Sequence, residues 1–237
     1  NWDATHAIRA PTGYKVLLTG AAAFNGKFHV WDVNSSGVIT RGSGWKTSLE
    51  ANSLNWEHTF STDLNNDTFI SGGSSYLLAG PNGPITLRNS RGTTYSDAFT
   101  PSWDATHAIR TPTGYKVLLT GAAAQSNKFY VWDTNADGVI TRGSGWKTAA
   151  QSTDLNWEHT FAKDFDSNGL ISGGSSYLLA GPNGPISLRN SSGWKPSDAS
   201  TPNWDATHAI RTPTGYKVLL TGAAAHNNQF YVWDTNA

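Results

Sequence analysis

The residues best suited to chemistry are four short runs of Asp and Asn. In each run the side-chain oxygens recur at alternate positions, and in three of the four a glycine follows. This is the pattern that opens a calcium-binding loop, because the spacing lets hard oxygens converge on one hard cation. The candidate ligands are Asp63, Asn65 and Asp67; Asp133, Asn135 and Asp137; and Asp164, Asp166 and Asn168. The pattern favours calcium at the 63–67 and 164–169 loops over the 32–37 loop, where Asp32 is the only charge.

A second interpretation of these loops stays open. A complete EF-hand loop ends with a bidentate Glu at its twelfth position, and all four runs have a serine there. Glu57 and Glu158 stand six residues before Asp63 and Asp164 and could supply a carboxylate from the preceding strand. However, Asp-Gly and Asn-Gly also favour the tight turn between antiparallel strands. The loops are therefore predicted either to bind calcium or to act as hairpin turns.

The tryptophans are the second set of candidates, because the chain holds 11 of them. Trp45, Trp146 and Trp194 follow Gly- and Ser-rich turns, beside polar residues. A ring on such a loop could stack on the apolar face of a sugar, so these three are our candidate carbohydrate-binding residues. The alternative, which we favour, is that each ring packs as a wedge between neighbouring units.

No arrangement typical of an enzyme is present. The sequence has no cysteine nucleophile, no Gly-x-Ser-x-Gly elbow and no phosphate-binding glycine loop. Its carboxylates and histidines recur at equivalent positions, whereas an active site usually needs one asymmetric cluster. We therefore predict a protein that is not an enzyme, with histidines in structural roles.

The candidate residues recur because the chain itself repeats. Trp2, Trp103 and Trp204 open three copies at a constant spacing of 101 residues, and Trp56 and Trp157 open a related unit inside each of the first two copies. One domain, 1–237, is therefore predicted to contain units 2–55, 56–102, 103–156, 157–203 and 204–237, of which the last is incomplete. Internal repetition at this spacing predicts a repeat architecture.

The units are predicted to be all-β. Each reads as four short antiparallel strands separated by Pro-x-Gly and Asp/Asn turns, including a strand at 56–60 that places Trp56, His58 and Phe60 on one face. Consecutive apolar residues at 16–18 indicate strands covered on both faces. Only 48–51 and 148–151 favour a helix, of about one turn. We expect a five-repeat array like a β-propeller, or alternatively a linear stack of β-units.

Bulk properties narrow the partners. The 17 basic and 17 acidic residues cancel, so a nucleic-acid partner is not expected. No apolar run is long enough to span a bilayer, which predicts no membrane insertion. Because the sequence lacks methionine, we expect a processed product or an excerpt of a longer protein.

Several motifs carry a family resemblance. They run from Gly114-Tyr115 through the 129–138 segment (Phe-Tyr-Val-Trp-Asp-Thr-Asn-Ala-Asp-Gly) to the 157–161 segment (Trp-Glu-His-Thr-Phe) and the 164–171 loop (Asp-Phe-Asp-Ser-Asn-Gly-Leu-Ile). The chain resembles the Trp-rich repeats of large secreted bacterial proteins of the haemolysin (RTX-like) type. The resemblance implies an extracellular, calcium-stabilised module without enzymatic activity. The chain departs from the pattern at Thr68, where the loop glycine is missing, and at 35–36.

Two functions follow as hypotheses. The first is an extracellular or cell-surface module with a binding or adhesive role, displaying several weak sites to a carbohydrate or a cell-surface protein. The alternative is a structural segment of a long surface or fibre protein, able to self-associate through its incomplete last unit. A structural segment predicts an unpaired sheet edge at 230–234. A lectin-like module predicts equivalent pockets in each unit of one type.

Overall fold

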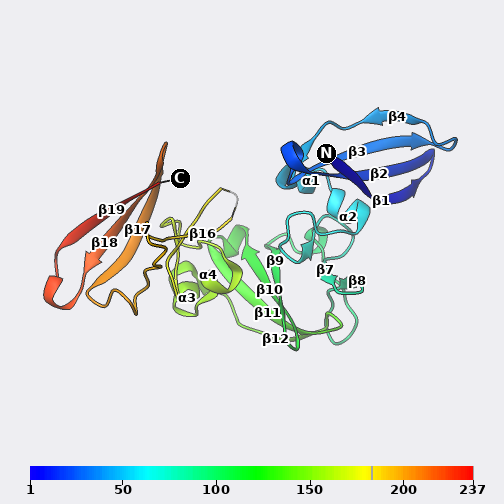
Figure 1. Ribbon diagram of the computed structural model, residues 1–237. Helices are drawn as coiled ribbons and strands as arrows, with labels where there is room; N and C mark the ends of the chain where they lie inside the picture. The colour runs from blue at the N-terminus through cyan, green and yellow to red at the C-terminus, as the bar shows by residue number, and fades with distance from the viewer. Residues whose placement is uncertain (183, 237) are drawn as a thin grey trace. The chain divides into compact units, whose positions relative to one another are not determined.

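The computed structural model describes residues 1–182 and 184–236, and it is built mainly from antiparallel sheets of three to five strands (Figure 1). The contacts divide the chain into two compact units. The first comprises Asn1–Ser126 with Tyr130–Ser144, and the second comprises Asn127–Phe129 with Gly145–Ala237. Each unit is described by itself. The all-β class is confirmed in this general form.

Each copy that begins with Trp folds into a sheet of consecutive antiparallel strands, which we call a Trp sheet. The first consists of β1 (Trp2–Ala10), β2 (Gly13–Gly20), β3 (Lys27–Asn34), β4 (Ile39–Gly42) and β5 (Lys46–Thr47), and the second of β9 (Trp103–Thr111), β10 (Gly114–Gly121), β11 (Lys128–Asn135), β12 (Ile140–Gly143) and β13 (Lys147–Thr148). The third consists of β17 (Trp204–Thr212), β18 (Gly215–Gly222) and β19 (Phe230–Asn236). In the first two sheets the fifth strand pairs with the third, and a one-turn 3-10 helix precedes the third strand of all three (η1, Ala22–Phe24; η3, Ala123–Gln125; η4, Ala224–His226).

The glycine in the Pro-Thr-Gly turn of each Trp sheet lies at a position where there is no space for a side chain. A Cβ atom on Gly13 would lie 2.0 Å from the carbonyl oxygen of Val33, and Gly114 and Gly215 meet the third strands of their sheets in the same way. The glycine therefore lets β1 turn into β2 directly beside β3. The turn itself was predicted from the sequence, and the close approach to β3 was not.

A second kind of element follows each complete Trp sheet, and it contains helices. In the first copy it consists of α1 (Ser48–Ser53), α2 (Trp56–Phe60), β6 (Phe69–Ile70), β7 (Leu77–Gly80), β8 (Gly83–Thr86) and η2 (Asp97–Phe99). In the second it consists of α3 (Ala149–Asp154), α4 (Trp157–Phe161), β14 (Leu170–Ile171), β15 (Leu178–Leu179) and β16 (Ile186–Ser187). The helices predicted at 48–51 and 148–151 are confirmed, and each begins with a capping box, formed by Thr47 with Glu50 and by Thr148 with Gln151.

The prediction of a strand at 56–60 is wrong. The segment forms α2, which begins after Asn55 in the left-handed conformation and buries Trp56, Glu57 and Phe60. Helical spacing places residues four apart on one face, so the Trp56–Phe60 pair suits a helix as well as a strand. The second kind of element therefore has helices and three strands, and not the four strands predicted for it. No closure of the sheets into a propeller is shown.

Each element buries its apolar residues against a neighbour in the sequence. Leu17 of β2 packs with Trp56 and Phe60 of α2. In the first unit, β6–β8 form a core with the second Trp sheet through residues such as Leu78 and Val117. In the second unit, β14–β16 form the equivalent core with β17 and β18. The adjacent residues Leu17 and Leu18 are both buried, which confirms that the central strand is covered on both faces.

His29 on β3 is half-buried, and both of its ring nitrogens are buried. Neither ring nitrogen has a hydrogen-bond partner among the described residues, and the ring lies 5.4 Å from that of Trp45. Burial lowers the pKa of His29. The other two Trp sheets have a tyrosine at this position, and a Cβ on Gly143 would touch the hydroxyl of Tyr130. Gly42 leaves equivalent room beside His29.

We expect His29→Tyr to reduce the acid sensitivity of the first unit. Since the folded state lowers the pKa, folding favours the neutral ring; that contribution is present at pH values above the unfolded histidine pKa of about 6.5 and is lost as the pH falls through it toward the folded pKa. Urea unfolding of both proteins at neutral pH and below about pH 6 tests this expectation. Equal losses of unfolding free energy on acidification in the two proteins would contradict it, since titrations shared by both cancel in the comparison.

Among the described residues, no helix has the length and apolar character needed to cross a membrane.

Candidate calcium loops

A buried glutamate holds each of the two loops that follow α2 and α4. The side chain of Glu158 is completely buried; its Oε1 accepts a hydrogen bond from the N–H of Phe165 (2.9 Å) and its Oε2 accepts one from Ser172 (3.0 Å). Glu57 accepts the equivalent bonds from Leu64 (3.1 Å) and Ser71 (3.3 Å). The glutamate thus links the start of the Asp loop to the residues after it, from a helix rather than from the strand that we predicted.

The 164–169 loop brings three carboxylates together. Glu158, Asp164 and Asp166 each offer one oxygen, and the three oxygens lie within 4.8 Å of one another. Two oxygens bound to one calcium ion at its usual bond lengths are at most about 5 Å apart. The spacing and the hard oxygen donors therefore fit one shared calcium ion. Among the residues that the structure describes, no other group of acidic or histidine side chains is gathered so closely.

Asp164 has the environment of a metal ligand. Its Oδ2 accepts a hydrogen bond from Gly169 (2.8 Å), but its Oδ1 is buried and has no hydrogen-bond partner among the described residues. Burial raises the pKa of Asp164, and the nearby charge of Asp166 adds to the effect. A buried carboxylate oxygen that lacks a positive partner is costly, and a cation at this point would remove the cost.

The 164–169 loop is also hydrogen-bonded to strand β17. The carbonyl oxygen of Asn168 accepts a hydrogen bond from Ala209 on β17 (2.7 Å). Gly169 has φ +82°, and a Cβ there would lie 2.0 Å from the carbonyl oxygen of Ala209. The side-chain oxygen of Asn168 is used within the loop, by Leu170 N–H (2.8 Å). The conformation of this loop therefore directly affects how the third Trp sheet packs against it.

The 63–67 loop has the same connections with a different charge distribution. Asp63 accepts a hydrogen bond from Thr68 (2.8 Å), and Asp67 accepts one from Phe69 (2.8 Å) and one from the amide of Asn65 (2.9 Å). Burial raises the pKa of Asp67 to about 7, and the charges of Asp63 and Glu57 add to this increase. The carbonyl oxygen of Asp67 accepts a bond from Ala108 (3.0 Å) on β9. This loop too holds negative charge at a point that contacts a Trp sheet.

Thr68 occupies the position that Gly169 has in the other loop, and it takes a left-handed conformation (φ 64°). A β-branched residue is strained in this region. We therefore expect Thr68→Gly to raise the free energy of unfolding by about 1 kcal/mol, measured by urea unfolding. The reciprocal change, Gly169→Thr, should destabilise by more, because its Cβ also meets Ala209. A Thr68→Gly protein less stable than the wild type would show that the side chain of Thr68 matters more than its backbone strain.

The other two Asp/Asn runs form hairpin turns. Asp133 pairs with Lys116 (2.6 Å), and Asp32 pairs with Lys15 at the same distance. The side-chain oxygen of Asn135 accepts hydrogen bonds from the N–H groups of Asp137 (3.0 Å) and Val139 (2.9 Å), and Asp137 itself is an exposed residue. The structure thus does not bring Asp133, Asn135 and Asp137 together around one point. It favours the turn interpretation for these runs.

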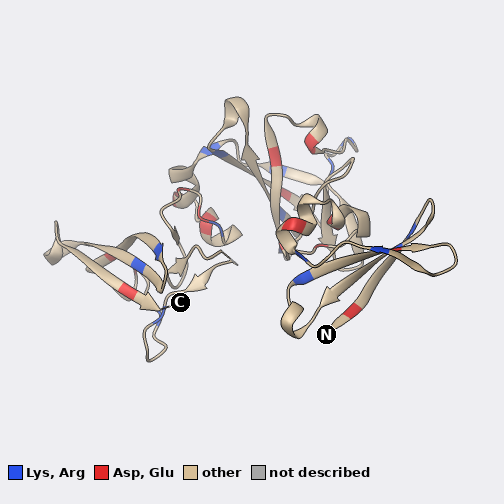
Figure 2. Cartoon of the chain, turned by 90° about the horizontal axis from the view of Figure 1, so that it is seen from above, with Lys and Arg blue, Asp and Glu red and all other residues tan. Residues whose placement is uncertain are grey.

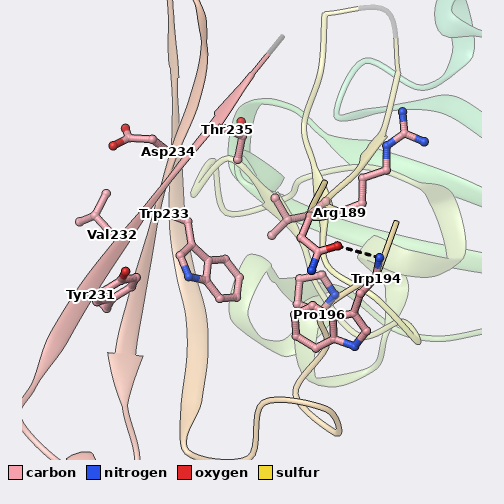
Figure 3. Close-up of a pocket in the computed structure, with 10 residues that line it drawn as sticks. Arg189, Trp194, Pro196, Tyr231, Val232, Trp233, Asp234 and Thr235 are labelled. Atoms are coloured by element: carbon pink, nitrogen blue, oxygen red, sulfur yellow. Dashed lines mark hydrogen bonds between the residues drawn. The ribbon is translucent and has the colours of Figure 1, made fainter. Parts of the chain in front are cut away.

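The three candidate carbohydrate-binding tryptophans lie in different environments. Trp45 is half-buried and stacks on Phe24, with ring centroids 4.6 Å apart. Trp146 is half-buried after Gly145. Trp194 is 44% exposed and lines a groove beside β19 (Figure 3). The three thus lie in unlike surroundings, and Trp45 stacks on a ring of its own unit, whereas the wedge role that we favoured predicts contact with a neighbouring unit.

Sequence reasoning missed the residues that complete each loop. Ser71 and Ser172 bind the buried glutamates through their N–H groups, and Ala108 and Ala209 bind the loop carbonyls. The only available signal was that a serine recurs at the same distance from the glutamate in both copies.

Comparisons with known proteins give the chain no family. It matches no protein-family model, and no curated protein is significantly similar to it. Lysine and arginine residues are scattered along the chain among acidic ones (Figure 2). That the partner is not a nucleic acid stays a prediction from the balance of charge.

Proposed function

We propose that the chain is a non-enzymatic extracellular repeat module whose two Asp loops bind calcium and thereby fix each helix-and-loop element on the Trp sheet beside it. The observation that carries the proposal is the environment of Asp164: its Oδ1 atom is buried and lacks a partner among the described residues, and one of its carboxylate oxygens lies within 4.8 Å of oxygens of Glu158 and Asp166. The residues that would hold the ion are Glu158, Asp164 and Asp166 in one loop. In the other loop the candidates are Glu57, Asp63 and Asp67, whose oxygens are not gathered within 4.8 Å in the structure and would have to move closer to share an ion.

The role of the ion in this proposal is structural. A ligand that binds only the folded state stabilises that state, by about 2.7 kcal/mol when its concentration is 100 times the dissociation constant. Both loops hydrogen-bond to a Trp sheet, through Ala108 and Ala209. An ion in either loop would therefore oppose the separation of the loop from its sheet.

The incomplete loops also favour an extracellular location. They lack the bidentate Glu at the twelfth position, and calcium modules that work outside cells bind in the range of about 0.1 to 1 mM. Weak loops are useful only where free calcium reaches such concentrations. A binding or adhesive role toward carbohydrate remains a prediction, which a glycan array with the 237-residue chain would test in calcium and in chelator.

Thermal unfolding of the chain in millimolar calcium, millimolar magnesium and chelator tests the proposal. We expect a higher melting temperature in calcium alone, because magnesium demands a smaller and more regular ligand cage. Calorimetric titration should show two sites per chain. Equal melting temperatures in all three solutions would refute calcium stabilisation.

A further inference from the structure

A cavity lies where three turns of the first unit meet. The turns join β7 to β8, β9 to β10 and β11 to β12, and the cavity between them measures about 420 Å³. Its apolar lining comes from three prolines and two aliphatic residues, Pro81, Pro84, Ile85, Pro112 and Ala136. A concave wall of this size that combines apolar residues with a few polar groups is typical of a small-molecule site.

Backbone contacts hold the three turns in place. Just after β8, the N–H of Arg88 donates to the carbonyl oxygen of Gly138 (3.0 Å), and the N–H of Ile140 donates to the carbonyl oxygen of Arg88 (2.8 Å). A Cβ atom on Gly138 would lie only 2.7 Å from the carbonyl oxygen of Thr86, and the β9–β10 turn meets β11 equally closely at Gly114. The cavity is therefore formed before a ligand arrives, which lowers the entropic cost of binding.

The polar side chains that line the cavity have no partners among the described residues. Arg110 and Asp137 lie on different turns, and neither the guanidinium nor the carboxylate forms an ion pair. Asn82 lies on the third turn and is exposed. Tyr115 belongs to the apolar core and is only 2% exposed, yet no described residue hydrogen-bonds to its hydroxyl. A hydroxyl at such depth normally has a partner, and a ligand in the cavity that Tyr115 lines would supply one.

We propose that this cavity binds a hexuronic acid residue of an acidic polysaccharide, that is, a sugar ring that carries a carboxylate. Arg110 pairs with the carboxylate through two parallel N–H groups, which is the strongest geometry for such a pair. Asp137 accepts hydrogen bonds from ring hydroxyls, while Asn82 and Tyr115 can each donate and accept. The prolines contact the C–H groups of the ring.

Charge and hydrogen bonding favour this class over its competitors. A neutral sugar would leave Arg110 without a partner, and a doubly charged phosphate would find one cation and the negative charge of Asp137. A zwitterionic amino acid would satisfy both charges but has no ring hydroxyls for Asn82 and Tyr115. The inference gives the predicted carbohydrate role a site other than the three tryptophans. It does not rest on calcium, because neither the 63–67 loop nor the 164–169 loop lines the cavity.

The test titrates the complete 237-residue chain with the methyl glycosides of glucuronic and galacturonic acid and with their neutral counterparts, which have a hydroxymethyl group in place of the carboxylate. Chelator is present, so that calcium bound to the carboxylate cannot contribute. We expect a uronide to give saturable shifts of the Arg110 Nε–H and Asn82 amide signals in NMR spectra, and its neutral counterpart to bind about tenfold more weakly. Absence of saturable shifts with both uronides, equal binding of the neutral sugars, or tighter binding of glycine would overturn the proposal.

Matched protein variants locate the contact. Arg110→Gln removes the cation and should bind the uronide about tenfold more weakly, with no change for the neutral sugar. Arg9→Gln makes the same change at the equivalent, exposed position of the first Trp sheet, outside the cavity, and should bind as the wild type does. Tyr115→Phe keeps the ring in the core and should weaken the binding of the uronide and of the neutral sugar severalfold. Undiminished uronide binding by Arg110→Gln, or an equal loss in Arg9→Gln, would refute the site.

Discussion

Replacing Asp164 and Asp166 together with asparagine should abolish the calcium response of the second unit while leaving its stability in chelator nearly unchanged. Asparagine keeps an oxygen that can accept the bond from Gly169, but it removes two of the three negative charges that lie within 4.8 Å of one another. We expect the loss of about 2 to 3 kcal/mol of stabilisation at saturating calcium, and a calorimetric stoichiometry reduced by one site. In chelator the variant should be equal to the wild type or slightly more stable, because like charges have been removed.

The hairpin turns provide the matched control for this experiment. Asp133→Asn with Asp137→Asn makes the same chemical change in a run with the same spacing, but there Asp133 pairs with Lys116. This control variant should keep the full difference in melting temperature between calcium and chelator. If both variants lost the calcium response equally, the effect would come from net charge and not from a bound ion.

The sequence predicted the frame of the molecule well, because turn chemistry and repetition are local signals. The Pro-Thr-Gly turns, the central strands buried on both faces and the short helix at 48–51 all appear where the pattern placed them. The helix at 56–60 was missed because its apolar residues stand at positions that suit either period. The helix begins after Asn55, which has a left-handed backbone conformation. The pattern of apolar and polar side chains does not predict that conformation.

The candidate site could be predicted only in part for a related reason. Four runs share the oxygen spacing, yet only the two that follow α2 and α4 are held by a buried glutamate, whereas Lys116 and Lys15 pair with the other two. Each lysine lies on the neighbouring strand, 17 residues before the aspartate with which it pairs. Spacing within a loop therefore indicates which oxygens can converge, and long-range pairing decides whether they remain available.

The second large effect concerns Glu158, whose removal should destabilise the second unit both with and without calcium. In Glu158→Ala the buried N–H group of Phe165 and the half-buried N–H group of Ser172 lose their acceptors. A buried unsatisfied group costs about 1 to 3 kcal/mol and the half-buried one costs less, so we expect a loss of about 2 to 4 kcal/mol in chelator, measured by urea unfolding. This separates Glu158, which the fold itself needs, from Asp164 and Asp166, which matter once the ion is present.

Glu158→Gln is the companion variant that separates packing from charge. Glutamine preserves the volume and one acceptor, so it should retain more stability in chelator than alanine does, while losing calcium affinity because a ligand charge is gone. The expected order of stability in chelator is wild type, glutamine, alanine. If alanine were tolerated in chelator as well as glutamine is, the two hydrogen bonds would contribute little, and the buried glutamate would have to be explained by the ion alone.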